Sequence, residues 1–221
     1  MIEATKRAWF EALFDLYNHR LLKKHFHTIY LSSSSAIPLP SQAVFCINHS
    51  SWWDALVLFH LNRHVLHKDL YVMMHEKGLT EYPFFRKLGA FSVNRDKPRD
   101  IIRSLSYSGK LLQEGKTVGL FPQGDEFHLE KRPLHFLPGS ISLIEKYKQI
   151  PLLPICFYYS FGHVKKPEVY IHIGEPIYYD QLQGNERKDK NTALERMYTL
   201  QLDKLRELVI NEKVDSFHPI L

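Results

Sequence analysis

Short apolar runs alternate with longer amphipathic stretches along most of this chain, and this alternation limits its fold more than any other feature. Short runs are typical of buried strands, and three- or four-residue spacing of apolar side chains is typical of helices. The expected strands are 43–47, 70–74, 91–93, 117–121, 152–158 and 169–173, and the expected helices are 53–61, 82–88, 98–115, 140–148 and 192–210. This order predicts an α/β fold with a mixed, largely parallel sheet flanked by helices.

The first residues form a separate, amphipathic stretch with helical periodicity over 2–24. Its apolar residues are expected on one side (Phe10, Leu13, Phe14, Tyr17 and Leu21), with Arg7, Glu11, Asp15 and Asn18 on the other. A basic flank follows, so the stretch suits a helix at a membrane surface, although a helix packed on the main domain shows the same pattern. Polar and proline residues then occupy 32–35 and 38–40, so we expect an N-terminal segment over 1–36 and a main domain over 37–221.

Composition and charge exclude several classes of protein. The 221 residues are 44% hydrophobic, which excludes a disordered or fibrous chain. The net charge of +5 points to an anionic partner, such as a nucleic acid, a membrane surface or a phosphorylated substrate. No apolar stretch reaches the roughly 18 residues that a spanning helix requires, so we expect none.

The two cysteines and the acidic residues near the N-terminus indicate the compartment. Cys46 and Cys156 both lie inside apolar runs, where buried, unreactive thiols are expected rather than a disulfide framework or a zinc site. Glu3, Glu11 and Asp15 interrupt the apolar region that a signal peptide would need. We therefore expect a protein of the reducing cytoplasm.

The strongest chemical feature is a histidine and an aspartate, His49 and Asp54, five residues apart where the first expected strand of the main domain ends. In a parallel sheet, ligands bind beyond the carboxyl ends of the strands. A carboxylate that accepts a proton from one imidazole nitrogen leaves the other nitrogen as a base. His64 and Asp69 have the same spacing but lie in a polar stretch, so context rather than spacing favours the first pair.

Two further polar loops follow expected strands. One contains Gly124, which allows close approach of a ligand to the backbone, and the other contains Arg95 just before a helix, a suitable place for an anion. Each loop alone reads more simply as a solvated turn. Together with His49 and Asp54, they could line one crevice.

Four blocks of sequence resemble the glycerolipid acyltransferases of the lysophosphatidate acyltransferase (PlsC-like) type. In order, they are NHSSWWD at 48–54, AFSVNR at 90–95, FPQG at 121–124 and IPLLPI at 150–155. The first is similar to the family's NHX4D signature, and the third is similar to its Phe-Pro-Glu-Gly-Thr-Arg block. The order of the four blocks makes the resemblance specific, although each block alone is not.

The resemblance implies an enzyme that transfers an acyl chain from acyl-CoA or an acyl carrier protein to a lipid hydroxyl, without a covalent acyl-enzyme. His49 would be the catalytic base and Asp54 its orienting partner, and the expected substrate-binding residues are Arg95, Phe121, Pro122, Gln123 and Gly124. No metal and no cofactor besides the acyl thioester is implied. The N-terminal segment would contact the membrane, which places the protein peripherally on the cytoplasmic face.

The third block departs from the family pattern in a way that concerns the acceptor. Gln123 replaces the usual glutamate, Asp125 replaces threonine, and Glu126 replaces the arginine that the family associates with the acceptor's phosphate. Two acids would repel a phosphate, although Arg95 remains. The acceptor is therefore either a lysophospholipid or a lipid without phosphate, such as a glycolipid or a carotenoid glycoside.

Three other functions fit less well. A metal-dependent hydrolase could use the histidines near His60 and His64, but no recognised metal motif is present. A nucleic-acid-binding protein would account for the charge, but the basic residues are interspersed with acids. A non-catalytic protein that binds lipid surfaces would keep the fold and lose the chemistry.

Overall fold

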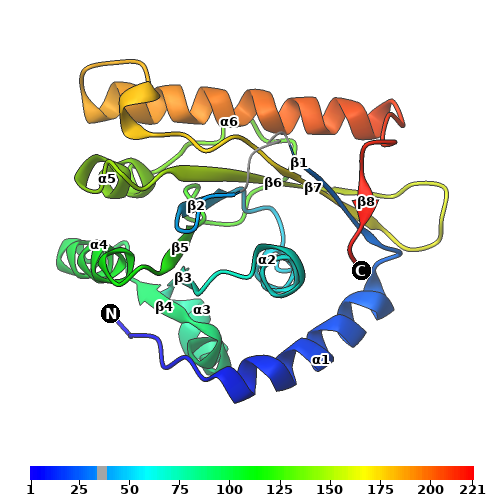
Figure 1. Ribbon diagram of the computed structural model, residues 1–221, viewed down its shortest axis with the longest axis horizontal. Coiled ribbons are helices and arrows are strands. Elements are labelled where there is room, and N and C mark those ends of the chain that lie inside the picture. Colours follow the sequence, from blue (N-terminus) through cyan, green and yellow to red (C-terminus); the bar gives the residue numbers. More distant parts are fainter. Residues whose placement is uncertain (34–38) are drawn as a thin grey trace.

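The computed structural model describes residues 1–33 and 39–221, and within them one sheet of eight strands runs through the molecule in the order β4-β3-β5-β2-β6-β7-β1-β8 (Figure 1). The strands are β1 (Ile29–Ser33), β2 (Val44–Ile47), β3 (Leu70–His75), β4 (Ala90–Val93), β5 (Thr117–Leu120), β6 (Leu152–Ser160), β7 (Glu168–Ile173) and β8 (His218–Pro219). The predicted class, a mixed α/β sheet flanked by helices, is confirmed.

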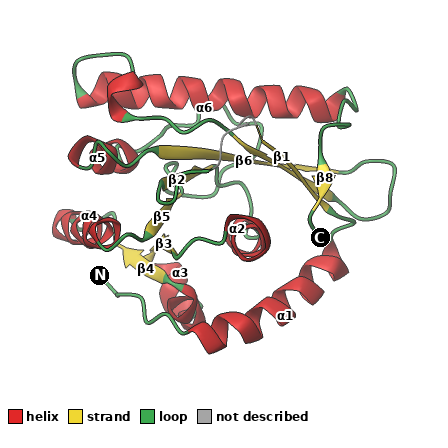
Figure 2. Ribbon diagram, viewed as in Figure 1, coloured by secondary structure: helices red, strands yellow, loops and turns green. Residues whose placement is uncertain are grey.

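Helices cover both faces of this sheet (Figure 2). They are α1 (Ala8–His25), α2 (Asp54–Leu61), α3 (Glu76–Glu81), α4 (Pro98–Gln113), α5 (Gly139–Lys146) and α6 (Arg187–Ile210), with a π-helical turn at Asn62–Leu66 and 3₁₀ turns at Pro83–Leu88 and Tyr179–Gln181. Successive side chains of β2 point to opposite faces. Val44 and Cys46 pack in the core beneath α4, α5 and α6, and Phe45 and Ile47 pack in the core beneath α1 and α2.

Strand direction brings the loops that contain the predicted site to one edge of the sheet. β2 runs parallel to β5 and β6, and β3 runs parallel to β4 and β5, so the carboxyl ends of these five strands open on the same side. β7 is antiparallel to β6, and β1 is parallel to β7. The loops after β2, β4 and β5 can therefore contribute to one site.

The N-terminal segment differs from the prediction in two ways. The helix begins at Ala8 rather than near residue 2, because the preceding residues are extended and Ile2 N–H donates to Ser92 Oγ over 2.6 Å. The predicted division of the helix into an apolar and a polar side is also wrong. Asn18 is fully buried and donates to the Leu56 carbonyl, whereas Leu13 is 58% exposed.

Other elements were missed because nothing local in the sequence indicates them. β1 lies within the predicted N-terminal segment and pairs with β7, about 140 residues later in the chain. The predicted boundary between residues 36 and 37 lies outside the described residues, as do positions 34, 35 and 38 of the predicted polar linker. Ser32 and Ser33, which were expected in that linker, belong to β1. That domain division stays a prediction.

The sequence prediction for the two cysteines is met. Cys46 and Cys156 are free and fully buried, and burial raises the pKa of the Cys156 thiol to about 12, so this thiol is unreactive. In addition, no helix in residues 1–33 and 39–221 combines the length and the apolar character needed to cross a bilayer.

Candidate active site

His49 and Asp54 are in direct contact at the carboxyl end of β2. His49 Nδ1 lies 2.8 Å from Asp54 Oδ2, and Asp54 is the first residue of α2. A six-residue loop between the end of β2 and the start of α2, residues 48–53, is thus sufficient to bring the two side chains together. The structure brings together the pair that the sequence predicts.

Asp54 is fully buried and both of its carboxylate oxygens are occupied. Oδ2 also accepts the backbone N–H groups of Ser50 and Ser51, over 2.7 and 3.0 Å, and Oδ1 accepts the Tyr159 hydroxyl over 2.6 Å. Hydrogen bonds to a charged acceptor are the strong ones, and the start of a helix favours a negative charge. Asp54 is therefore fixed as an acceptor, and His49 Nδ1 is the donor that it orients.

The backbone before His49 is held as firmly as the carboxylate behind it. Asn48 exchanges two hydrogen bonds with the backbone of Phe157 in β6, over 2.8 and 2.9 Å. Its own N–H donates to the Tyr198 hydroxyl from α6, which in turn donates to the Ile155 carbonyl. The asparagine of the first block therefore locks the strand end that presents the histidine.

The loop after β5 supports His49 from the other side. The Phe121 ring packs on the imidazole with 4.5 Å between centroids, and Gln123 Oε1 accepts the His49 N–H over 2.7 Å. Gln123 is 6% exposed and does not line the cavity described below. The structure thus places Gln123 as a support for the His49 backbone, whereas its predicted role was substrate binding.

Arg95 from the loop after β4 reaches the same place across Gly124. Gly124 has a φ of +74°, and a Cβ there would lie 2.7 Å from Arg95 Nη1, so only glycine suits both the backbone and the arginine. Arg95 Nη2 lies 3.3 Å from Asp125, and Nε is buried with no hydrogen-bond partner among the described residues. The guanidinium also lines the cavity described below, where it can donate to an anionic ligand.

A cavity of about 780 Å³ opens beside these residues. Its polar end contains His49, Arg95 and Gly124, together with Asp125 and Glu126. Away from them, it is lined by apolar side chains from several elements, including Leu58, Leu70, Val72, Phe85, Leu88, Ala90, Leu105 and Leu120. The cavity thus has the size of a ligand site and the lining that an acyl chain requires.

Asp125 and Glu126, the two acids that distinguish the third block from the family pattern, both lie at the site. Glu126 Oε1 is 3.7 Å from His49 Nε2, the nitrogen that does not contact Asp54, and Asp125 contacts Arg95. One acid therefore lies beside His49, and the other lies beside the side chain predicted to bind an anion. Both acids line the cavity.

Of the predicted site residues, His49, Arg95, Phe121, Pro122 and Gly124 line the cavity, and Asp54 and Gln123 hold His49 from behind. Sequence reasoning missed Tyr159, since no motif surrounds it. The alternative pair is separated in the structure. His64 contacts Asp15, and Asp69 pairs with Lys6 and Lys116.

Comparison with known proteins shows the family to which the chain belongs. The chain matches the family Acyltransferase over residues 28–158, more than half its length, and it therefore belongs to that family. It is 28% identical over 166 residues to a 1-acyl-sn-glycerol-3-phosphate acyltransferase of Bacillus subtilis (strain 168), covering 72% of this chain and 78% of the relative. The expectation of an acyltransferase is confirmed.

A solved structure shows the same fold. The 1-acyl-sn-glycerophosphate (LPA) acyltransferase PlsC from Thermotoga maritima superposes with a TM-score of 0.64 at 18% identity, over 89% of this chain and 79% of that one. The predicted family resemblance thus extends from the sequence blocks to the arrangement of the sheet and helices.

Tyr159 offers a test of how the carboxylate is held. Burial and the adjacent Asp54 raise the pKa of Tyr159 well above its ordinary value, so its hydroxyl remains a donor. Tyr159→Phe would leave Asp54 Oδ1 without this partner and should lower the free energy of unfolding by roughly 1–3 kcal/mol. Turnover should fall as well, because His49 loses its fixed support.

The neighbouring tyrosine of β6 is the matched control for this variant. Tyr158 packs in the core on the opposite face of the sheet, so Tyr158→Phe should leave turnover within about twofold of the wild type. Equal turnover in both variants and the wild type would show that the Tyr159 hydroxyl does not contribute to the site. Denaturant unfolding and acyl-transfer assays measure the two effects.

Proposed function

We propose that this protein transfers an acyl chain from acyl-CoA or acyl carrier protein to the hydroxyl of a lipid, with His49 as general base. The observation that carries the proposal is the buried Asp54 carboxylate behind His49, at the polar end of a cavity with an apolar lining. An apolar cavity suits the acyl chain, and an oriented neutral imidazole suits the activation of an alcohol. The relatives named above are, by name, acyltransferases that act on an acylated glycerophosphate.

The reaction follows from this arrangement in two steps. The acceptor oxygen attacks the thioester carbonyl carbon while His49 Nε2 takes its proton, and Asp54 stabilises the imidazolium that forms. The tetrahedral intermediate then collapses, the carbon–sulfur bond breaks, and the thiolate leaves with the proton from His49. No covalent acyl-enzyme is formed, and the thioester is the only co-substrate that the step needs.

Replacing the base tests the proposal directly. His49→Ala should lower the rate of acyl transfer from labelled acyl-CoA by about 10²–10⁴-fold, the usual contribution of a positioned acid–base group. His163→Ala is the matched control, since His163 also contacts a carboxylate but is exposed on the surface. Full activity in His49→Ala would overturn the mechanism. No product with any acceptor, in the wild type, would instead favour a non-catalytic lipid-binding protein.

For the acceptor, we propose a lysophospholipid whose phosphate binds Arg95. The Arg95 side chain in the cavity wall supports this choice, as does the name of the Bacillus subtilis relative. A second candidate is a lipid without phosphate, such as a glycolipid or a carotenoid glycoside. It is supported by Asp125 beside Arg95 and by Glu126 beside His49, which both oppose a phosphate.

An acceptor panel separates the two candidates. With lysophosphatidate as acceptor, the double variant Asp125→Thr, Glu126→Arg should raise kcat/KM by about tenfold over the wild type, because an acidic pair no longer opposes the phosphate. With a neutral glycolipid, the same variant should show no gain. A wild-type enzyme that acylates the glycolipid and not lysophosphatidate would establish the second candidate in place of the first.

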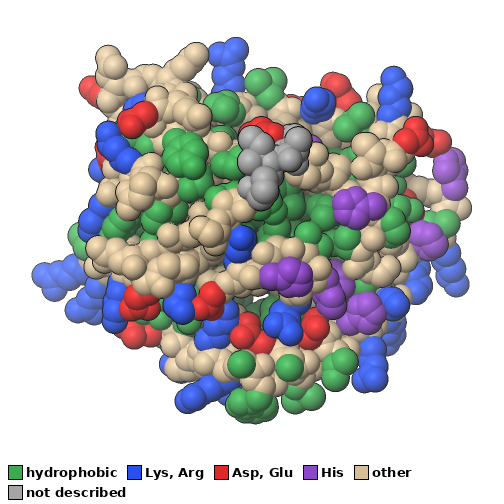
Figure 3. All heavy atoms as spheres, viewed as in Figure 1, with side chains coloured by type: hydrophobic (Ala, Val, Ile, Leu, Met, Phe, Trp, Pro, Cys, Tyr) green, Lys and Arg blue, Asp and Glu red, His purple; other side chains and the backbone are tan. Residues whose placement is uncertain are grey.

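We also propose that α1 binds the cytoplasmic face of a membrane peripherally. Four apolar side chains of this helix are more than half exposed, namely Trp9, Leu13, Leu16 and Tyr17. Figure 3 shows hydrophobic side chains gathered along the lower edge of the molecule, where α1 lies in Figure 1. The last turn of α1 carries Lys23 and Lys24, which would meet anionic head groups.

Vesicle binding tests this placement. Leu13→Glu with Leu16→Glu should reduce the fraction of protein that floats with phosphatidylglycerol vesicles at least fivefold, because charged side chains do not enter the apolar layer. Ile102→Glu, at a comparably exposed position on α4, should bind like the wild type. Equal flotation of all three proteins would contradict the assignment of α1 as the membrane-binding helix.

A further inference from the structure

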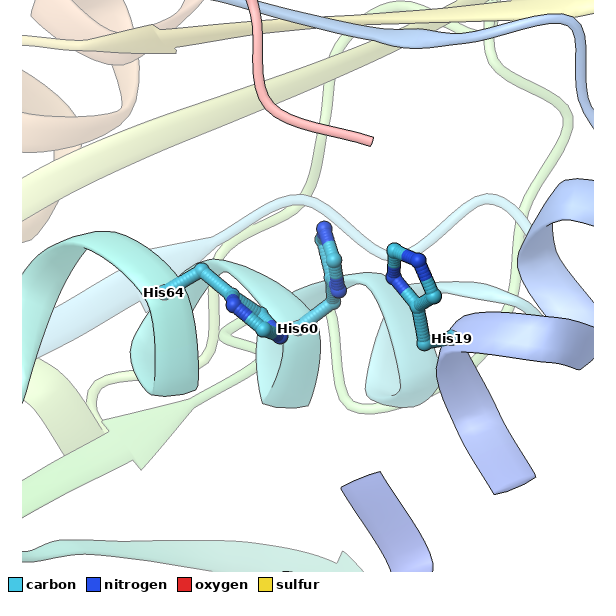
Figure 4. A group of neighbouring side chains, drawn as sticks. All are labelled: His19, His60 and His64. Carbon is cyan, nitrogen blue, oxygen red and sulfur yellow. The ribbon is translucent and has the colours of Figure 1, made fainter. Parts of the chain in front are cut away.

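Three histidines meet between α1 and the helix formed by α2 and the π-helical turn that follows it. They lie outside the cavity that His49 lines. They are His19 from α1, His60 from α2 and His64 from the π-helical turn that follows, and their ring nitrogens lie within 4.8 Å of one another. Figure 4 shows the His60 ring between the other two. None of the three lines the cavity beside His49, so the cluster is separate from the proposed chemistry.

The spacing along both helices favours a shared ligand. His60 and His64 are four residues apart and so lie on one helical face. Asp15 and His19 have the same spacing on α1, and Asp15 Oδ1 lies 3.1 Å from His64 Nε2. Each helical stretch thus directs two side chains that can bind metal into the same gap.

The hydrogen bonding of His60 leaves one of its ring nitrogens, Nδ1, able to bind a metal. Its Nε2 donates to the Ile220 carbonyl over 2.7 Å, so Nδ1 carries the lone pair, and this atom is buried without a hydrogen-bond partner among the described residues. His60 is 0% exposed, and His19 Nδ1 is likewise buried and without a partner. A ring that donates from one nitrogen to a carbonyl and keeps the other bare is typical of metal ligands.

The cluster needs only local movement to hold a metal. Zinc–nitrogen bonds of about 2.0–2.1 Å place the nitrogens of a tetrahedral site about 3.4 Å apart, so the three rings must move toward one another. The exposed His64 side chain can move to allow it.

We propose that His19, His60 and His64 form a binding site for a divalent transition metal, Zn²⁺, with Asp15 orienting His64. Three imidazoles suit zinc, and the carboxylate fixes the ring as second-layer partners do in known metal sites. The ion links α1 to α2 and stabilises the packing of the N-terminal helix on the rest of the molecule. Its role is structural and does not depend on the proposed acyl transfer.

Metal titration of the full chain, without an affinity tag, tests the proposal. The wild type should bind one equivalent of Zn²⁺ with a micromolar or lower Kd by calorimetry, and Zn²⁺ should raise its Tm. Co²⁺ should give the visible absorption bands of a four-coordinate site. His19→Ala and His64→Ala, at partly or fully exposed positions, should each weaken Zn²⁺ binding at least tenfold and abolish the rise in Tm.

Two controls keep the result specific to this cluster. His163→Ala removes an exposed histidine that also contacts a carboxylate, and it should bind Zn²⁺ within twofold of the wild type. Circular dichroism of the apo variants shows that they are folded. Less than half an equivalent of bound Zn²⁺, or equal loss in His163→Ala and His64→Ala, would overturn the proposal.

Discussion

The buried carboxylate of Asp54 is the interaction on which the site depends. A charge at a fully buried position is stable only if its oxygens are hydrogen-bonded. Here the partners come from three places: His49 at the end of β2, the backbone at residues 50 and 51, and Tyr159 from β6. The carboxylate therefore couples the conformation of the loop, the orientation of the imidazole and the position of β6 relative to β2.

The side chains around Asp54 also hold the site in place. Asn48 and Gln123 form hydrogen bonds that fix the backbone beside His49, and Gly124 allows Arg95 to pass close to the loop after β5. One face of the resulting site is a rigid support, and the other is an open cavity with an apolar lining. Such a division suits the proposed acyl transfer, in which His49 is held in place and the cavity admits the lipid chain.

Much of this was predictable from the sequence, since it depends on local patterns. The alternation of apolar runs predicted the sheet, and strand ends predicted that His49, Gly124 and Arg95 share one edge. Contacts between distant segments were not predictable. β1 pairs with β7, and Tyr159 meets Asp54 across 105 positions. The sides of α1 were mispredicted because tertiary packing buries Asn18 and exposes Leu13, against the order that hydropathy favours.

The most direct test of this account is the turnover of Asp54→Asn, measured together with its unfolding midpoint. Asparagine can keep the backbone contacts, but its neutral side chain no longer stabilises the imidazolium or fixes the tautomer of His49. We predict that acyl transfer falls by about 10²–10⁴-fold while the protein stays folded. Turnover within about twofold of the wild type, in a folded variant, would contradict the central role given to Asp54 and His49.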